Sequence, residues 1–252
     1  MIYNISHTSW WIISGDFIKK SDENLVIFFH GFTTDKSSSW RFDDISHDVD
    51  IHTNWSIFRF DFMGCWESGD WIISFGSECE DAQQVLRHFI DRGYTNIVIY
   101  GHSMWGTIAL MVYPFFQHYI QSLILSGPAV GPMCYNWEEY VGNDLYAVWS
   151  TQGYIELPSK CGRKVKVSYD IMKDFASINT EMLAKSMNCP ICIIHGNHPD
   201  DTEESELLKY SKKFISLYNK WKLIVLDGAK HTMMGYNEDI SKIITQALSK
   251  SL

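Results

Sequence analysis

The stretch NIVIYGHSMWGTIALM, residues 96–111, is the most informative part of this chain. It begins with a continuous apolar and β-branched run, which is typical of a strand buried on both faces of a sheet. The run breaks at Gly101, and an apolar segment of helical character begins at Met104. Ser103 is therefore expected on a sharp turn from a strand into a helix, with its hydroxyl above the carboxyl edge of the sheet.

A serine in this position has two interpretations. Ser103 can be a nucleophile, because the backbone N–H of Met104 would then point to where an oxyanion forms. It can equally be a capping residue whose hydroxyl accepts a hydrogen bond from the first turn of the helix expected over 104–116. The residues around the turn leave both interpretations open.

Similar apolar runs recur along the chain and alternate with amphipathic segments. Strands are predicted at 24–30, 55–61, 96–101, 120–127, 190–196 and 222–228, and helices at 79–92, 104–116, 204–219 and 237–251. This alternation predicts a doubly wound α/β fold, with a mostly parallel twisted sheet covered by helices on both faces.

The organisation predicted is a single domain over residues 1–252. Residues 1–20 are expected to add an antiparallel hairpin at the sheet edge, where Trp10, Trp11 and Ile12 would pack. The interval from about 131 to 188 interrupts the rhythm of strands and helices and is rich in Tyr and Trp. Because it falls between two strands on the ligand side of the sheet, we expect it to be an inserted lid.

Composition limits the possible partners and the location. The 252 residues carry a formal net charge of −9 with scattered basic residues, which argues against nucleic-acid binding. The first 20 residues have no cationic start and no long apolar run, so neither a signal peptide nor a membrane span is expected, and the location predicted is cytoplasmic. The six cysteines are expected to be free thiols.

Two further segments place reactive residues after predicted strands. His30, Gly31 and Phe32 follow the strand at 24–30, where the amide of Phe32 could be a second oxyanion donor. His231 follows the strand at 222–228, and Gly228 gives the chain freedom to turn the imidazole inward.

A nucleophilic serine also needs a histidine base that is oriented by a carboxylate. Asp200 and Asp201 lie between Ser103 and His231 in the chain, as the order serine, acid, histidine requires, and Asp201 is favoured. His195 and His198 could alternatively be metal ligands, but no third ligand has suitable spacing, so no metal site is predicted.

Together these segments resemble the α/β-hydrolase superfamily, and within it the small cinnamoyl and feruloyl esterase-like and serine aminopeptidase-like hydrolases. The resemblance covers most of the chain and rests on the segments HGFTTDK, FRFDFMG, YGHSMWG, IIHGNHPDDT and GAKH. It implies a cofactor-free serine hydrolase acting on esters, with the triad Ser103, His231 and Asp201. It also implies that the amides of Phe32 and Met104 form the oxyanion hole.

The chain departs from the pattern of these hydrolases in three places. The acid loop carries about two extra residues after Gly196, Cys65 and Trp66 stand where the family has a small loop, and Trp105 replaces the last glycine of G-x-S-x-G. That glycine normally lets the helix approach the strand closely. Gly106 is not expected to replace it, because one helical step rotates a position by about 100°.

The function predicted is hydrolysis of a small carboxylic ester through an acyl-enzyme intermediate. We expect His30, Trp105 and Trp137 to lie against a small-molecule ester substrate, and a homodimer is possible. The alternative is a weakly active or inactive hydrolase-fold protein that binds a ligand or protein partner, which the residues Trp105 and Trp66 favour. The aromatic residues of the lid, Tyr135, Trp137, Tyr140, Tyr146, Trp149 and Tyr154, favour an apolar or aromatic substrate group, unless they only pack the lid.

Overall fold

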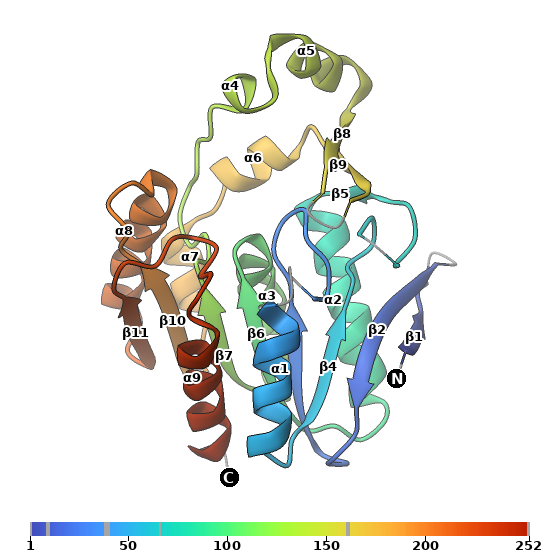
Figure 1. The fold of residues 1–252 in the computed structure, drawn as a ribbon, viewed down its shortest axis with the longest axis vertical. Coiled ribbons are helices and arrows are strands. Elements are labelled where there is room, and N and C mark those ends of the chain that lie inside the picture. Colours follow the sequence, from blue (N-terminus) through green and yellow to red (C-terminus); the bar gives the residue numbers. More distant parts are fainter. Residues whose placement is uncertain (1, 9–10, 38–40, 66, 160–161, 251–252) are drawn as a thin grey trace.

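The computed structural model describes residues 2–8, 11–37, 41–65, 67–159 and 162–250. Its centre is an eight-stranded sheet in the order β1-β2-β4-β3-β6-β7-β10-β11 (Figure 1). The strands from β4 to β11 in this order are parallel, as predicted. They are β3 (Asn24–Phe29), β4 (Ser56–Phe60), β6 (Asn96–His102), β7 (Ile120–Ser126), β10 (Ile191–Gly196) and β11 (Trp221–Leu226).

Helices cover both faces of this sheet and make two separate cores. Along β3, Ile27 and Phe29 belong to one core, while Val26 and Phe28 belong to the other. This alternation follows from the two-residue period of a strand. The first core holds α2 (Phe75–Ile90), α3 (Met104–Phe116) and α8 (Thr202–Leu217), and the second holds α1 (Arg41–His52) and α9 (Asn237–Lys250). The sequence patterns above had not predicted α1.

The expected hairpin is present at the sheet edge. Strands β1 (Ile2–Ser6) and β2 (Ile12–Ile18) are antiparallel, and β2 pairs with β4. Trp11 packs on Trp71, with 6.5 Å between ring centroids, as predicted. Ile12 is 50% exposed, which does not agree with the prediction, and Trp10 lies outside the described residues.

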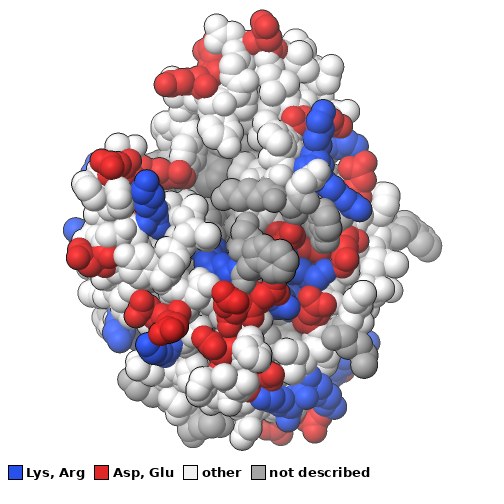
Figure 2. All heavy atoms as spheres, viewed as in Figure 1, with Lys and Arg blue, Asp and Glu red and all other residues white. Residues whose placement is uncertain are grey.

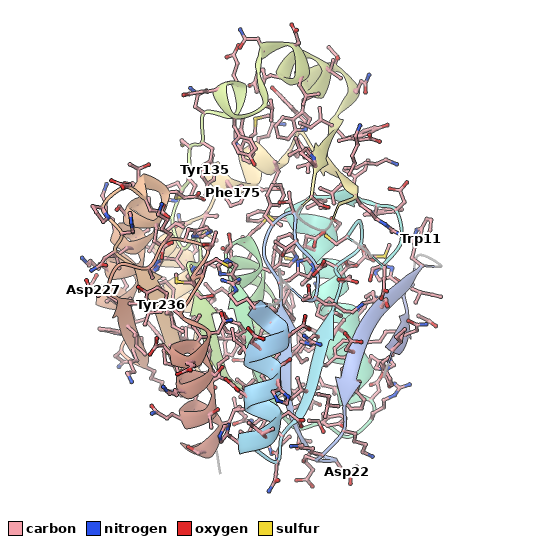
Figure 3. The ribbon with its side chains drawn as sticks, in the orientation of Figure 1. Trp11, Asp22, Tyr135, Phe175, Asp227 and Tyr236 are labelled. Carbon is pink, nitrogen blue, oxygen red and sulfur yellow. The ribbon has the colours of Figure 1, made fainter. Side chains whose placement is uncertain are left out.

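Most of the segment at 131–188 rises above the carboxyl ends of the parallel strands, whereas its last helix, α7 (Thr180–Ser186), lies beside α8 in the body (Figure 1). It also contains α4 (Trp137–Val141), α5 (Asn143–Gln152), β8 (Tyr154–Pro158), β9 (Lys164–Ser168) and α6 (Ile171–Ala176). Strand β9 pairs with β8 and with the short β5 (Ile72–Ile73), which ties the segment to the body. Tyr135 and Phe175 lie where it faces the body (Figure 3).

Figure 2 shows Lys and Arg interspersed with Asp and Glu over the visible face. Cys79, Cys134, Cys189 and Cys192 are free thiols, as expected, and Cys161 lies outside the described residues. No helix within the described residues has the length and apolarity needed to cross a membrane.

Candidate active site

Ser103 occupies a strained turn between β6 and α3. Its φ of 57° and ψ of −133° lie outside the regions that non-glycine residues usually adopt. Ser103 precedes α3 at the N-cap position, but its side chain makes no capping hydrogen bond. The hydroxyl instead bonds His231, with 2.9 Å between Oγ and Nε2. The capping interpretation of Ser103 is therefore wrong.

The close approach of strand and helix at this turn is made by Gly101 and Gly106. A Cβ atom on Gly101 would lie 2.8 Å from Gly106 Cα. A Cβ atom on Gly106 would lie 3.3 Å from the carbonyl oxygen of Gly101. The expectation that Gly106 cannot take this role is wrong, because the turn presents the third residue after Ser103 to the strand.

Trp105 points away from the strand contact and into the core. Its side chain is fully buried, and its Nε1–H donates to Glu78 Oε2 at 2.7 Å. Its ring also lies 4.8 Å from that of His30 and 5.4 Å from that of Phe62, centroid to centroid. The indole therefore occupies a packed, hydrogen-bonded position in the core behind the turn at Ser103, and it does not line the cavity.

His30 is likewise a core residue. It is 0% exposed, its Nε2 accepts from the amide of Phe62 at 3.1 Å, and its Nδ1 contacts Gly31 O at 3.0 Å. Burial lowers the pKa of His30 to about 4, so the imidazole is neutral at pH 7. The prediction that His30 and Trp105 contact the substrate does not agree with these positions.

His231 is held by the loop that follows β11. Gly228 has a φ of +73°, which reverses the chain, and the Tyr236 hydroxyl donates to Asp227 O at 2.5 Å across the loop (Figure 3). The backbone N–H of His231 donates to Asp201 Oδ2 at 2.8 Å. These contacts turn the imidazole toward Ser103.

The acidic partner of the His231 imidazole is Glu204. The distance from His231 Nδ1 to Glu204 Oε2 is 2.7 Å. Asp201, which the sequence favoured, is instead the N-cap of α8, where Oδ1 accepts from the Glu204 amide at 2.9 Å. Asp200 is exposed, with 83% of its side chain accessible. The structure therefore replaces Asp201 by Glu204 beside the imidazole, because α8 turns Glu204 inward while Asp201 caps the helix.

The charges of this pair support one another. Burial raises the pKa of Glu204, but hydrogen bonds from His195 and His231 outweigh it and lower the pKa to about 2. Burial likewise lowers the pKa of His231, but the bond to Glu204 and its charge, with the charges of Glu203 and Asp201, raise it above 6.5. Glu204 is thus an anion that stabilises a cation on His231.

Phe32 and Met104 both line the cavity in front of Ser103. Thr34 closes the loop after β3, because its hydroxyl accepts from the Gly31 amide at 3.1 Å and donates to Gly31 O at 2.7 Å. Among the described residues, no hydrogen-bond acceptor meets the amides of Phe32 and Met104. Neither backbone N–H is therefore engaged by an acceptor within the described part of the chain.

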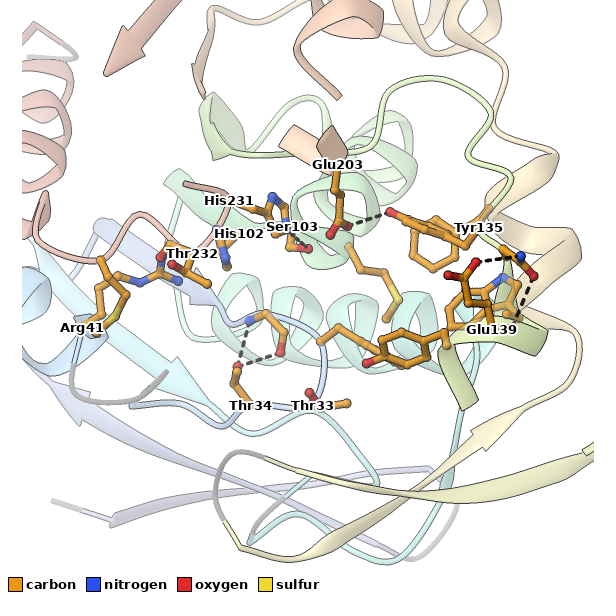
Figure 4. A pocket seen from close by; sticks show the side chains of 18 residues that line it. Thr33, Thr34, Arg41, His102, Ser103, Tyr135, Glu139, Glu203, His231 and Thr232 are labelled. Carbon is orange, nitrogen blue, oxygen red and sulfur yellow. Dashed lines mark hydrogen bonds between the residues drawn. The ribbon is translucent and has the colours of Figure 1, made fainter. Parts of the chain in front are cut away.

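The cavity has a volume of about 770 Å³ and lies between the body and the lid. Figure 4 shows Ser103, His102 and His231 near its middle, Arg41 and Thr232 at one end and Tyr135 and Glu139 at the other. The aromatic residues that line it are Phe32, Tyr135, Trp137, Tyr140 and Phe175. Trp137 thus lines the cavity, whereas Trp149 is buried inside the lid and its Nε1–H donates to Val167 O at 2.9 Å.

The histidines considered as metal ligands have other partners. His195 Nδ1 lies 2.8 Å from Glu204 Oε1, and His198 Nδ1 accepts from the Asp200 amide at 3.2 Å. Across the described ranges, no three His, Cys, Asp or Glu side chains gather as a group that could hold a metal ion.

The chain is similar to known hydrolases in sequence. A sequence model of the family described as "Serine aminopeptidase, S33" matches residues 20–230. A protein of Mycoplasma genitalium, named for a presumed esterase or lipase activity, is 31% identical over 121 residues. That alignment covers 44% of this chain and 40% of the relative, so the chain spans less than half of the relative's length.

Solved structures show the same fold. Est1E of Butyrivibrio proteoclasticus with bound ferulic acid has a TM-score of 0.75 and 18% identity, covering 99% of this chain and 98% of Est1E. DcsB in complex with a substrate analogue has a TM-score of 0.81 and 14% identity, covering 100% and 99% of the two chains. The chain belongs to the serine aminopeptidase S33 family and has the α/β-hydrolase fold.

Proposed function

We propose that this hydrolase cleaves small carboxylic esters through an acyl-enzyme on Ser103. The observation that carries the proposal is the continuous contact from Ser103 Oγ to His231 Nε2 at 2.9 Å and from His231 Nδ1 to Glu204 Oε2 at 2.7 Å. This is the arrangement of a nucleophile, a base and an orienting carboxylate. The name of the Mycoplasma relative supports the choice of an ester substrate.

In the first step, Ser103 Oγ attacks the ester carbonyl while His231 Nε2 takes the hydroxyl proton. The amides of Phe32 and Met104 bind the oxyanion, and Glu204 stabilises the imidazolium. His231 then returns the proton to the leaving alcohol. Water attacks the acyl-enzyme by the same route, with His231 as base, and the carboxylic acid leaves Ser103.

The substrate class follows from the cavity wall. A volume of about 770 Å³ accommodates a small organic ester, and Tyr135, Trp137 and Phe175 present aromatic faces at the lid end. We therefore propose an ester with an apolar or aromatic group at this end. The alternative of an inactive binding protein is not favoured, because Trp105, its main support, is accommodated behind the elbow; Trp66 lies outside the described residues.

The test is labelling by a fluorophosphonate, combined with hydrolysis of a p-nitrophenyl ester. The wild-type chain is expected to be labelled and active, and Ser103→Ala is expected to lose the label and about 10³-fold or more of its turnover. Circular dichroism of Ser103→Ala controls for folding. Normal turnover by the folded variant would refute the proposal.

A further inference from the structure

Glu204 contacts a second histidine on the side away from His231. His195 is 0% exposed at the end of β10, and its Nδ1 lies 2.8 Å from Glu204 Oε1. The same oxygen accepts from the Gly196 amide at 2.8 Å. On its other side, His195 Nε2 lies 2.7 Å from the hydroxyl of Ser211, which is also 0% exposed. These contacts form one continuous hydrogen-bond network that runs through Ser211, His195, Glu204, His231 and Ser103.

The ionised carboxylate determines which ring nitrogens in this hydrogen-bond network carry a proton. An ionised carboxylate only accepts hydrogen bonds, so both His195 and His231 must carry a proton on Nδ1. Nε2 of neutral His231 is then the acceptor that Ser103 needs. On the far side, His195 Nε2 faces the Ser211 hydroxyl. His195 therefore supports the anion of Glu204 with a hydrogen bond from Nδ1.

Glu204 needs this support because its side chain is long and comes from a helix. Its own backbone amide is held by Asp201, but that contact leaves the side-chain torsions unset. His195 and the amide of Gly196 fix Oε1, and the remaining oxygen then faces His231. Gly127 leaves the space for this, since a Cβ atom there would lie 3.3 Å from Glu204 Oε2 and 2.8 Å from the His231 ring.

We infer that His195 is a positioning residue for the reaction, acting on Ser103 and His231 through Glu204. The inference rests on the proposed function. His195 does not line the cavity, so it acts without touching the substrate. The acid of this site therefore lies on α8 and not in the loop after β10, and His195 holds its carboxylate through Oε1.

Two substitutions of His195 separate its two contacts. His195→Asn keeps an amide donor near the place of Nδ1, facing Glu204, whereas His195→Gln moves its amide toward Ser211 and away from Glu204. We expect His195→Gln to lower kcat about 10- to 100-fold, as loss of a partner that orients a functional histidine does in metal sites, with KM nearly unchanged. His195→Asn is expected to retain most of kcat.

The double variant His195→Gln, Glu204→Gln shows whether the effect passes through Glu204. The rate of Ser103 labelling by a fluorophosphonate is measured alongside turnover, because it reports on the nucleophile directly. A residue that acts through Glu204 has no further effect once Glu204 is replaced. An equal loss in both backgrounds, or equal kcat for the Asn and Gln variants, would overturn the inference.

Two further measurements keep the test decisive. Melting curves identify variants that do not fold. If His195→Gln is one of them, Ser211→Ala repeats the test from the other end of the hydrogen-bond network. Its kcat loss is expected only when Glu204 is present. The proton on His231 Nδ1 should give a downfield NMR signal that survives in His195→Asn and shifts in His195→Gln. An unchanged signal in His195→Gln would argue against positioning. If the wild-type chain neither hydrolyses esters nor reacts with the probe, the proposed function fails, while this signal still tests the contact.

Discussion

Gly101 and Gly106 meet at the turn that carries Ser103, with only 2.8 Å between the place of a Gly101 Cβ and Gly106 Cα. A glycine at position 105 is therefore not required, because Gly106, the next residue, makes the close contact with the strand. The indole of Trp105 is free to enter the core. The elbow is intact although the sequence signature is broken.

We expect Gly101→Ala to lower both turnover and stability, because its Cβ would press on the backbone of Gly106. Tilting of the Met104 amide could cost up to about 10²- to 10³-fold in kcat, the effect of losing one oxyanion donor. Gly106→Ala is the matched control. Its Cβ would meet Pro128 Cβ at 3.2 Å and no atom closer, so a smaller effect is expected. Kinetics and melting curves on both variants measure this, and a larger loss in Gly106→Ala would show that the contact is misassigned.

Glu204→Gln is expected to lower kcat by about 10³- to 10⁴-fold, because the amide cannot hold an imidazolium and favours the wrong tautomer. Asp201→Asn should cost far less, since asparagine also caps helices and only the contact with the His231 amide is lost. Steady-state turnover of the two variants, with Asp200→Asn as a surface control, compares them. A larger loss in Asp201→Asn would restore the aspartate to the triad.

The pH dependence of kcat/KM should follow the His231 imidazole. Because the pKa of His231 is raised above 6.5 and only the neutral ring accepts the Ser103 proton, activity should fall as the pH drops through a midpoint above 6.5. In Glu204→Gln the contribution of the anion is gone and burial lowers the pKa, so the midpoint should move to lower pH. A pH-rate profile of each form measures the shift; a midpoint that stays in place would remove Glu204 from this role.

Replacement of Trp105 is expected to destabilise the protein and to bring no gain in activity. Trp105→Phe leaves Glu78 Oε2 without its indole donor, which costs about 1–3 kcal/mol. Trp105→Gly also opens a cavity and should cost about 3–5 kcal/mol. Urea unfolding gives both values.

Glu78→Gln is the control for the Trp105 contact. Burial and the charge of Asp81 raise the pKa of Glu78 well above its usual value, which favours the neutral carboxyl that glutamine resembles. Its amide oxygen can still accept from Trp105, and a small effect is expected. Faster ester hydrolysis by a stable Trp105→Gly protein would instead mean that the indole strains the elbow.

Trp137→Ala should discriminate between substrates. Loss of an aromatic wall that buries an aromatic group costs about 1.5–3 kcal/mol, or roughly 10- to 100-fold in kcat/KM for an aromatic ester. Acetyl esters of the same alcohol should be much less affected. Tyr146→Ala is the matched lid control, because Tyr146 packs on Tyr169 with 6.2 Å between ring centroids and is absent from the cavity wall. Equal losses for both esters would place the aromatic group elsewhere.

Much of this molecule could be predicted from local sequence. Buried parallel strands are continuously apolar, so the six predicted runs match β3, β4, β6, β7, β10 and β11 within a few residues. Ser103 directly follows β6, and His231 lies shortly after β11; the carboxyl ends of both strands lie at one edge of the sheet. Their meeting follows from that topology, and the structure places Ser103 Oγ 2.9 Å from His231 Nε2.

The identity of the acid and the place of Trp105 needed the tertiary structure. Asp201 and Glu204 are one helical turn apart, and the sequence offers both carboxylates in the right order. Glu204 is the partner of His231 because of the direction in which α8 leaves β10 and because His195 holds the other oxygen of its carboxylate. Likewise, local spacing identifies Trp105 as a break in the signature, but the space beside Glu78 that receives the indole is formed by α2, far away in the sequence. Side-chain partners across elements depend on packing angles and distances of a few ångströms, which residue order alone does not specify.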